Sequence, residues 1–297
     1  MAKNMFRPVA TSLLFTILCV SLRADEQVAR EAWDLKHSAG TEIEFKRREA
    51  LLMAELRSGI MPDWAGEFAR GDGLGVNVRL LLAPEGGFVF NWRGCLGLYD
   101  INYGAVEVRD GHLMLRFELP NTEQGFEGIA GEFVPVRWGD RLYLLATREA
   151  REFANAINSG FEPCDGMCAR FLLRAGDEQK SAAGRPELPP EFLRYLLEKP
   201  IEARVTKVLE NVTRSEDKSG FAWRTRKVEL DVGRKAGVWE GMAFNEVSRE
   251  GAGETFRVTE VRDATSIAVS FEPYITDVDV EKKVASCLST SREGRCN

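Results

Sequence analysis

Residues 103–119, YGAVEVRDGHLMLRFEL, have the pattern of a β-hairpin and indicate the fold class of the chain. Two runs of alternating apolar and polar residues, 103–109 and 112–119, flank the pair Asp110-Gly111. Asp-Gly is among the pairs best able to hold the positive backbone dihedrals of a tight two-residue turn. The stretch therefore predicts two antiparallel strands joined by that turn.

The residues around this hairpin predict further strands. Alternation begins after Gly75, and the turn residues 84–87 lead into a second run at 88–92. Strands are also expected at 133–136 and 142–145, and residues 148–158 have the apolar spacing of a helix. Strands joined by short turns favour an antiparallel sheet or barrel, so we expect a β-rich domain over 60–174 with a helix near its C-terminal end.

The segment 25–59 predicts helix, interrupted at 38–40, since charged and apolar residues mix at helical spacing without proline. Thr41 and Glu44 have the spacing of a capping box. Gly59 and Pro62 supply a stop. The expected buried stripe comprises Ile43, Ala50, Leu51 and Ala54. This helix either packs on the β-domain or binds a partner.

A second β-domain is expected over 201–275, after a linker with a short helix at 175–200 and before a tail at 276–297. Its strands are predicted at 201–209, 223–232, 242–247, 255–261 and 266–271. The fold class is therefore α+β and mainly antiparallel β, with an N-terminal helical segment followed by two small β-barrel or β-sandwich-like domains.

Residues 1–24 have the layout of a secretory signal peptide, with Lys3 and Arg7 ahead of a short apolar run and Ala24 at the cleavage position. The alternative is a membrane anchor, but 9–22 is short for a span of about 20 apolar residues. No later segment has a long uncharged apolar run. We expect a periplasmic or secreted protein without an integral membrane span once the signal is removed.

The charge balance argues against nucleic acid as a partner. The chain carries 40 basic and 46 acidic residues, a net charge of -6 that becomes -9 if Lys3, Arg7 and Arg23 leave with the signal. Nucleic acids and anionic lipids bind clustered Lys and Arg, so neither is expected as the main ligand.

Five cysteines remain after loss of Cys19, and export makes disulfides possible. Local pairs are Cys164 with Cys168 and Cys287 with Cys296. The first pair is alternatively half of a metal site, but it lacks a second pair and a nearby His, so no metal is predicted. Cys95 lies in an apolar run and is expected to be a buried thiol.

Residues suited to catalysis are few. The two histidines, His37 and His112, have no metal-binding spacing, and neither a nucleophile elbow nor a phosphate-binding glycine loop occurs, so no cofactor is predicted. A carboxylate-dependent hydrolase around Asp100, Asp110 and Asp140 is the enzymatic alternative, because glycoside hydrolysis uses two facing carboxyl groups. Whether the chain is an enzyme stays open on these residues.

Aromatic residues concentrate in the first β-domain. Exposed aromatic faces stack on sugars or anchor protein partners, whereas aromatic residues at alternating strand positions are more often core. The turn at 138–141 brings Trp, Asp and Arg together. The residues predicted for a binding surface are Trp92, Tyr99, Tyr103, Trp138, Asp140 and Arg141.

Residues 228–242, VELDVGRKAGVWEGM, contain a strand, a glycine turn and a Gly-Val then Gly-Met corner. The glycines permit a sharp turn back into the sheet, and Val238 and Met242 are expected to plug the end of a barrel. This corner resembles small periplasmic β-domains, including those of the rod-shape scaffold protein MreC and of some flagellar assembly proteins. The resemblance implies a non-enzymatic envelope module that contacts other proteins.

Taken together, the sequence predicts an exported cell-envelope protein that acts as a binding or assembly module. Its expected partner is another envelope protein or a glycan. The alternative is the carboxylate-dependent hydrolase, acting on an envelope glycan or peptide.

Overall fold

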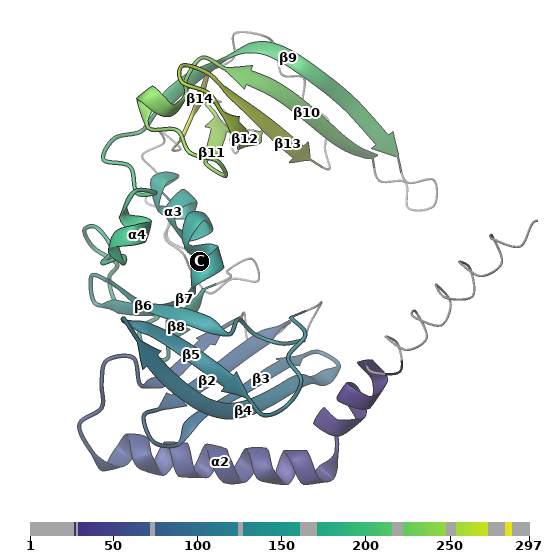
Figure 1. Ribbon diagram of the computed structural model, residues 1–297, viewed down its shortest axis with the longest axis vertical. Helices are drawn as coiled ribbons and strands as arrows, with labels where there is room; N and C mark the ends of the chain where they lie inside the picture. The colour runs from purple at the N-terminus through teal and green to yellow at the C-terminus, as the bar shows by residue number, and fades with distance from the viewer. Residues whose placement is uncertain are drawn as a thin grey trace, which may run out of the picture. The chain divides into compact units, whose positions relative to one another are not determined.

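The computed structural model describes residues 27, 29–71, 75–123, 127–160, 171–215, 222–247, 254–272 and 283–286 (Figure 1). The chain divides into two compact units, 1–132 and 133–297. The fold is mainly antiparallel β, as the sequence predicts.

The strands form two sheets. The first contains β1 (Gly66–Arg70), β2 (Asn77–Ala83), β3 (Gly87–Gly94), β4 (Gly97–Arg109), β5 (His112–Phe117), β6 (Glu132–Trp138), β7 (Arg141–Ala146) and β8 (Leu172–Arg174), and it closes into a barrel in that order. The second contains β9 (Glu202–Ser215), β10 (Ala222–Leu230), β11 (Ala243–Glu246), β12 (Thr255–Val261), β13 (Ser266–Glu272) and β14 (Lys283–Ala285). Its order is β10-β13-β12-β11-β14-β9, closed by pairing of β9 with β10.

The hairpin over 103–119 is confirmed. Strands β4 and β5 pair in antiparallel register from Gly104 opposite Phe117 to Arg109 opposite His112. Asp110 and Gly111 have φ values of 51° and 82°, the positive dihedrals that this tight turn requires.

Strands β2 to β4 are buried on both faces, which explains why apolar residues occur at both odd and even positions in their sequences. Helix α2 (Ala39–Ser58) lies along one face, where Phe45 and Leu52 pack with Leu81, Val89 and Ile101 (Figure 1). On the other face, residues such as Leu80, Leu82, Phe88 and Phe90 are fully buried. Burial on two faces replaces the simple alternation of a half-buried strand.

The helix at 39–58 is confirmed, but its predicted cap and stripe are wrong. Ser38 is the N-cap, and its hydroxyl accepts a hydrogen bond from the Thr41 amide at 3.2 Å. Ile43 and Leu51 are 70% and 53% exposed, whereas Phe45 and Leu52, seven residues apart, form the buried seam.

The face of α2 that meets the sheet is selected by polar contacts as well as apolar ones. Arg48 donates to Glu118 at 2.7 and 2.8 Å, and Glu55 accepts from the backbone amides of Glu85 and Gly86 at 2.8 Å each. The spacing of apolar residues gives no information on such polar contacts. The buried stripe that this spacing predicts for α2 therefore lies on a different face from the observed one.

In the second unit, α3 (Ala150–Asn158) confirms the helix expected at 148–158. The ring of Phe153, on α3, makes edge-to-face contacts with Tyr143 and Phe171 at centroid distances of 5.6 and 5.0 Å. A short helix, α4 (Pro190–Leu193), follows. Residues from the segment 175–200, predicted as a linker, join this core: Leu188, Tyr195 and Leu196.

The strands predicted within 201–271 are all confirmed, and β1, β8 and β14 were not predicted. The core of the second barrel comprises Ala203, Val205, Val228, Leu230, Val238, Met242, Phe244, Phe256, Val258 and Ala268. The sequence missed the last of these strands because β14 is only three residues long and pairs with distant partners in β9 and β11.

Helix α3 is tied to the second barrel by polar side chains within the same unit. The Asn155 amide donates to the Gly241 carbonyl at 2.8 Å, and its oxygen accepts from the Ala243 amide at 2.9 Å. Asn245 donates to the Ser159 hydroxyl at 3.1 Å, and Arg257 donates to Glu152 at 3.0 Å. These contacts hold α3 beside the glycine corner, where the candidate site lies.

Candidate functional site

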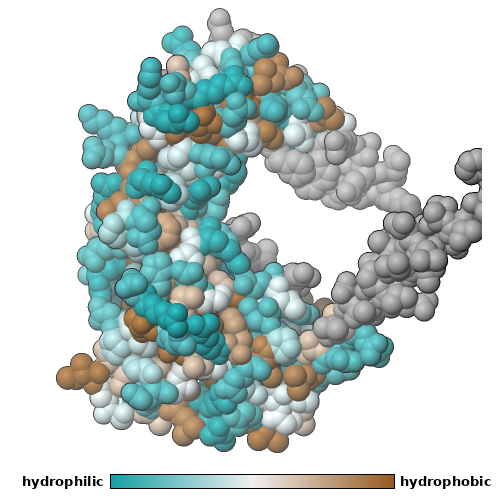
Figure 2. Space-filling view, in the orientation of Figure 1, coloured by the Kyte–Doolittle hydropathy of each residue, from teal (hydrophilic) through white to brown (hydrophobic). Residues whose placement is uncertain are grey.

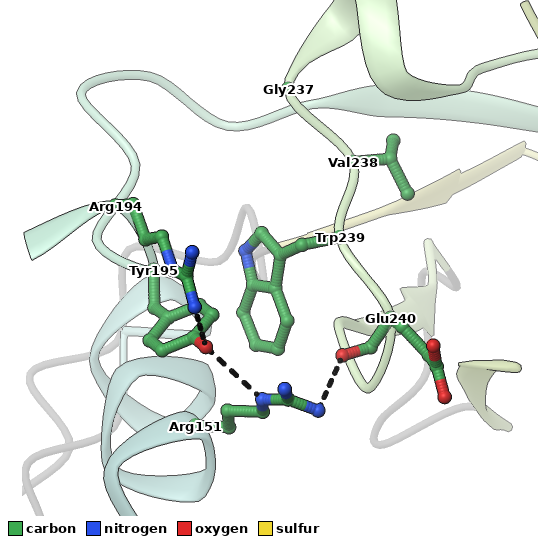
Figure 3. Close-up of a pocket in the computed structure, with 7 residues that line it drawn as sticks. All are labelled: Arg151, Arg194, Tyr195, Gly237, Val238, Trp239 and Glu240. Carbon is green, nitrogen blue, oxygen red and sulfur yellow. Dashed lines mark hydrogen bonds between the residues drawn. The ribbon is translucent and has the colours of Figure 1, made fainter. Parts of the chain in front are cut away.

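A pocket of about 270 Å³ lies in the second unit where α3, the chain after α4 and the glycine corner meet (Figure 3). Arg151 comes from α3, and Arg194 and Tyr195 follow α4 directly. The corner supplies one wall. The pocket residues are Arg151, Arg194, Tyr195, Gly237, Val238, Trp239 and Glu240.

The corner has the backbone geometry expected of its glycines. A Cβ on Gly233 would lie 2.3 Å from the Arg262 carbonyl oxygen, so a side chain there would clash with backbone. Gly237 and Gly241 have φ values of 89° and 94°. Val238 and Met242 are buried in the core of the second barrel, and Trp239, which lies between them in the sequence, lines the pocket.

Tyr195 lies at the centre of the polar contacts in the pocket. Its hydroxyl accepts from Arg194 Nη2 at 2.8 Å and from Arg151 Nε at 3.3 Å, and both guanidinium groups also lie over its ring. Burial by itself would raise the pKa of Tyr195, but the hydrogen bonds and positive charges of Arg151 and Arg194 outweigh burial and lower it. The phenol is therefore held in a positively charged environment.

The two pocket arginines have no acidic partner among the residues that the structure describes. Arg48, Arg79 and Arg257, in contrast, each form ion pairs with glutamates. Two positive charges, neither paired with an acid in the described part of the chain, thus converge in one small hollow of a chain with a net charge of -6. Such an arrangement favours an anion.

The remaining wall is aromatic. The rings of Trp239 and Tyr195 are 4.9 Å apart between centroids and tilted by 60°. The backbone carbonyl of Glu240 accepts from Arg151 Nη1 at 3.4 Å, while the Glu240 carboxylate points away from that guanidinium (Figure 3). The pocket therefore suits a ligand with both a negative group and an apolar part.

The structure places three predicted aromatic residues in the first unit. Tyr103 is 6% exposed, with the Arg48 guanidinium 4.4 Å from its ring centre. Trp92 is half-buried beneath Arg70, and Tyr99 lies next to Cys95. Tyr103 at least belongs to the core rather than to an open stacking face, in keeping with the alternative that alternating aromatic residues are core.

The turn at 138–141 holds a neighbouring segment of the chain in place. Trp138 is 8% exposed and donates from Nε1 to the Gly184 carbonyl at 2.9 Å. Arg141 donates to the carbonyls of Lys180 and Glu178 at 2.7 and 2.9 Å. The Asp140 side chain is exposed, and the backbone amide of Asp140 donates to the Ser181 carbonyl. These contacts orient residues 178–184.

The surface contains no broad apolar face in the view of Figure 2, where hydrophobic residues are scattered among mostly hydrophilic ones. Scattered exposed apolar residues are normal in soluble domains and indicate no site by themselves. The aromatic pocket is therefore a more specific feature than the visible surface around it.

The expectation that Cys95 is buried is wrong. Cys95 is exposed and free, at the turn between β3 and β4, with its sulfur 3.8 Å from the Tyr99 hydroxyl. The apolar run around it ends in a turn, whose tip faces solvent. The other cysteines, Cys19, Cys164, Cys168, Cys287 and Cys296, lie outside the described residues, as do residues 1–24, which the sequence predicts to be a signal peptide.

The carboxylates of the hydrolase alternative do not form a pair on β4. Asp100 lies near the start of β4 and Asp110 follows its end, so they are separated by ten residues, or about 33 Å of extended chain. Asp100 is fully buried and paired with Lys36. Paired catalytic carboxyl groups lie about 5 to 10 Å apart, so Asp100 and Asp110 cannot serve together.

No sequence pattern singles out Arg151, Arg194 and Tyr195 as site residues, and Trp239 stands out only as part of the corner. The one local signal is the tryptophan inside the Gly-Val-Trp-Glu-Gly turn, a large aromatic residue between two turn glycines that the structure leaves partly exposed. Arg151, on α3, and Arg194, directly after α4, carry no signal of their own, since both lie among other charged residues.

Comparison of the chain with protein-family models, with curated proteins and with solved structures gives no match. Within the described ranges, no helix is both long enough and apolar enough to cross a bilayer. Within the same ranges, no group of three or more His, Cys, Asp or Glu side chains is arranged to hold a metal ion.

Proposed function

We propose that this protein is an exported, non-catalytic binding or assembly module of the cell envelope. It holds an anionic group of its partner in the pocket formed by Arg151, Arg194, Tyr195 and Trp239. The proposal rests on one observation: two arginines without an acidic partner among the described residues converge on the Tyr195 hydroxyl in an aromatic pocket.

The chemistry of the pocket suits binding better than catalysis. A guanidinium stays protonated up to about pH 12, so it supplies charge and directed hydrogen bonds but does not exchange protons at physiological pH. Tyr195 is occupied by two of these donors. The other side chains lining the pocket are apolar, except for the carboxylate of Glu240, which points away from Arg151 (Figure 3).

The envelope location and the kind of partner come from the sequence. A signal peptide at 1–24 directs the protein to the periplasm or the exterior. The corner at 228–242, which resembles periplasmic β-domains, supplies the wall of the pocket that contains Trp239. We therefore propose another envelope protein as the partner, with a glycan as the weaker option because stacked sugars need no anion.

The test is capture of partners from a membrane and periplasm extract by the full-length protein, compared with the variant Arg194→Ala. We expect one stoichiometric partner with the wild type and at least tenfold less with the variant, since charge-assisted contacts in such pockets contribute about 1.5–3 kcal/mol. Arg148→Ala is the matched control, because Arg148 is an exposed arginine of the same unit outside the pocket.

Equal capture by wild type and Arg194→Ala would reject the pocket as the binding site. The hydrolase alternative is tested in parallel with a panel of envelope glycans and peptides. Turnover by the wild type that is lost in Asp110→Asn or Asp140→Asn would replace the binding module with an enzyme.

A further inference from the structure

We infer that the anion held in the Arg151–Arg194 pocket is the terminal carboxylate of a polypeptide, whose last side chain lies against Trp239 and Tyr195. This inference rests on the proposed binding function and specifies its ligand. Three properties of the pocket carry it: its volume, its charge and its aromatic wall.

The volume restricts the ligand to a group of about one residue. The pocket measures about 270 Å³, below the range of about 300–1,000 Å³ typical of sites for whole small molecules. An oligosaccharide needs a longer groove for its successive rings. A chain end fits, because only its last residue must enter while the rest of the peptide stays outside.

The charge of the pocket matches a planar monoanion. A guanidinium offers donors in a flat fork that pairs with both oxygens of a carboxylate. Arg194 donates to the Tyr195 hydroxyl from Nη2, and Arg151 donates to it from Nε and to the Glu240 carbonyl from Nη1. The other guanidinium nitrogens of both side chains can therefore donate to a ligand. The Tyr195 hydroxyl keeps the two forks on one side of the pocket.

The aromatic wall requires an apolar group next to the anion. Trp239 and Tyr195 present two large rings 4.9 Å apart, and Val238 lies beside them. Free inorganic phosphate would leave these rings without a contact. Among the described residues, the lining also includes no Lys, Ser or Thr, the side chains that commonly accompany arginine in phosphate sites.

The test uses calorimetric titration of the full-length protein with synthetic peptides. The probe is the acetylated hexapeptide GSGSGF with a free terminal carboxylate, and its controls are the same peptide amidated and the peptide GSGSGG with a free carboxylate. We expect the amide to bind at least tenfold more weakly, since it removes the charge, and GSGSGG to bind more weakly than GSGSGF, since it removes the apolar contact.

Variants assign the binding to the pocket. Arg194→Ala and Trp239→Ala should each weaken GSGSGF at least tenfold, Arg194→Lys should recover only part of the loss because it lacks the fork, and Arg148→Ala should bind like the wild type. Circular dichroism of each variant excludes loss of the fold as the cause.

Other outcomes separate the inference from the proposed function. Binding of inorganic phosphate or a phosphoserine peptide that depends on Arg194, without a preference of acid over amide, would reject the terminal carboxylate and keep the anion pocket. Equal binding of acid and amide, unaffected by Arg194→Ala, would reject the inference, and the capture experiment then decides the proposed function by itself.

Discussion

The ammonium group of Lys36 lies 2.7 Å from the carboxylate of Asp100, and the two side chains are 2% and 0% exposed. Lys36 ends the helical residues 29–36, whereas Asp100 lies on β4, so the ion pair fastens the helical segment to the sheet. Asp100 also accepts from the Gly128 amide at 2.6 Å. A buried charge is tolerated only with such partners.

Removing one member of this pair should strongly destabilise the protein. Lys36→Met leaves the Asp100 charge buried without its cation, at an expected cost of about 3–5 kcal/mol in the free energy of unfolding. Urea denaturation of the full-length chain measures it. Lys46→Met is the control, since Lys46 forms an exposed pair with Glu42 and its loss should have little effect. A small effect of Lys36→Met would show that the pair is not closed in solution.

The pair also predicts a pH dependence. Burial raises the pKa of Asp100 above 3.8, although the Lys36 and Gly128 bonds oppose the shift. The folded protein then binds this proton more tightly than the unfolded chain does, so the contribution of Asp100 to stability falls as the pH rises from about 3.8 through the raised pKa. The free energy of unfolding of the wild type, relative to that of Asp100→Asn, should therefore decrease as the pH rises over that range. Denaturation curves recorded at successive pH values measure this difference. An increase would mean that Lys36 dominates and lowers the pKa.

A second buried ion pair lies inside the second barrel. Arg226 donates to Glu254 at 2.7 Å, with both side chains 2% exposed, and the Ser270 hydroxyl donates to the same carboxylate. Arg226→Met should cost about 3–5 kcal/mol because Glu254 loses its cation. Arg262→Met, at an exposed pair with Glu260, is the control in thermal denaturation. Stability unchanged by Arg226→Met would contradict the buried network.

Asn155 should anchor α3 to the second barrel. Asn155→Ala removes two hydrogen bonds and leaves the Gly241 carbonyl and the buried Ala243 amide without their partner. We expect a loss of about 1–3 kcal/mol in chemical denaturation. Weaker binding of the GSGSGF peptide should accompany it, because Arg151 lies on the same helix. Asn211→Ala, at an exposed position on β9, should change neither measurement.

The phenol of Tyr195 should ionise at lower pH than an ordinary tyrosine. Arg151 and Arg194 lower its pKa below 10 despite burial. Ultraviolet titration of the wild type minus Tyr195→Phe isolates this phenol among the tyrosines. Repeating the titration in Arg194→Ala should move its pKa upward, since one charged donor is lost. A difference titration centred above 10 in the wild type would contradict the geometry of the pocket.

Sequence patterns predicted the secondary structure well because they report local backbone preferences. The Asp110-Gly111 turn, the strands of 201–271 and the helices at 39–58 and 148–158 each arise from residues within about 20 positions of one another. The glycine corner at 233–242 was equally readable, since its turn depends on the glycines themselves. The paired β14 was missed because its three residues are held only by distant strands.

Only the tertiary structure decided which faces are buried and where a site lies. Phe45 and Leu52 differ from the predicted stripe because α2 is oriented by contacts with residues about 30 or more positions away. Tyr195 lies 44 positions after Arg151, and Trp239 lies 44 positions after Tyr195, so no helix or strand periodicity in the sequence connects the three. They meet because Asn155 and the core around Phe153 dock α3 and the chain after α4 against the corner. The sequence by itself thus determined the strands and their turns, while long-range packing decided the pocket.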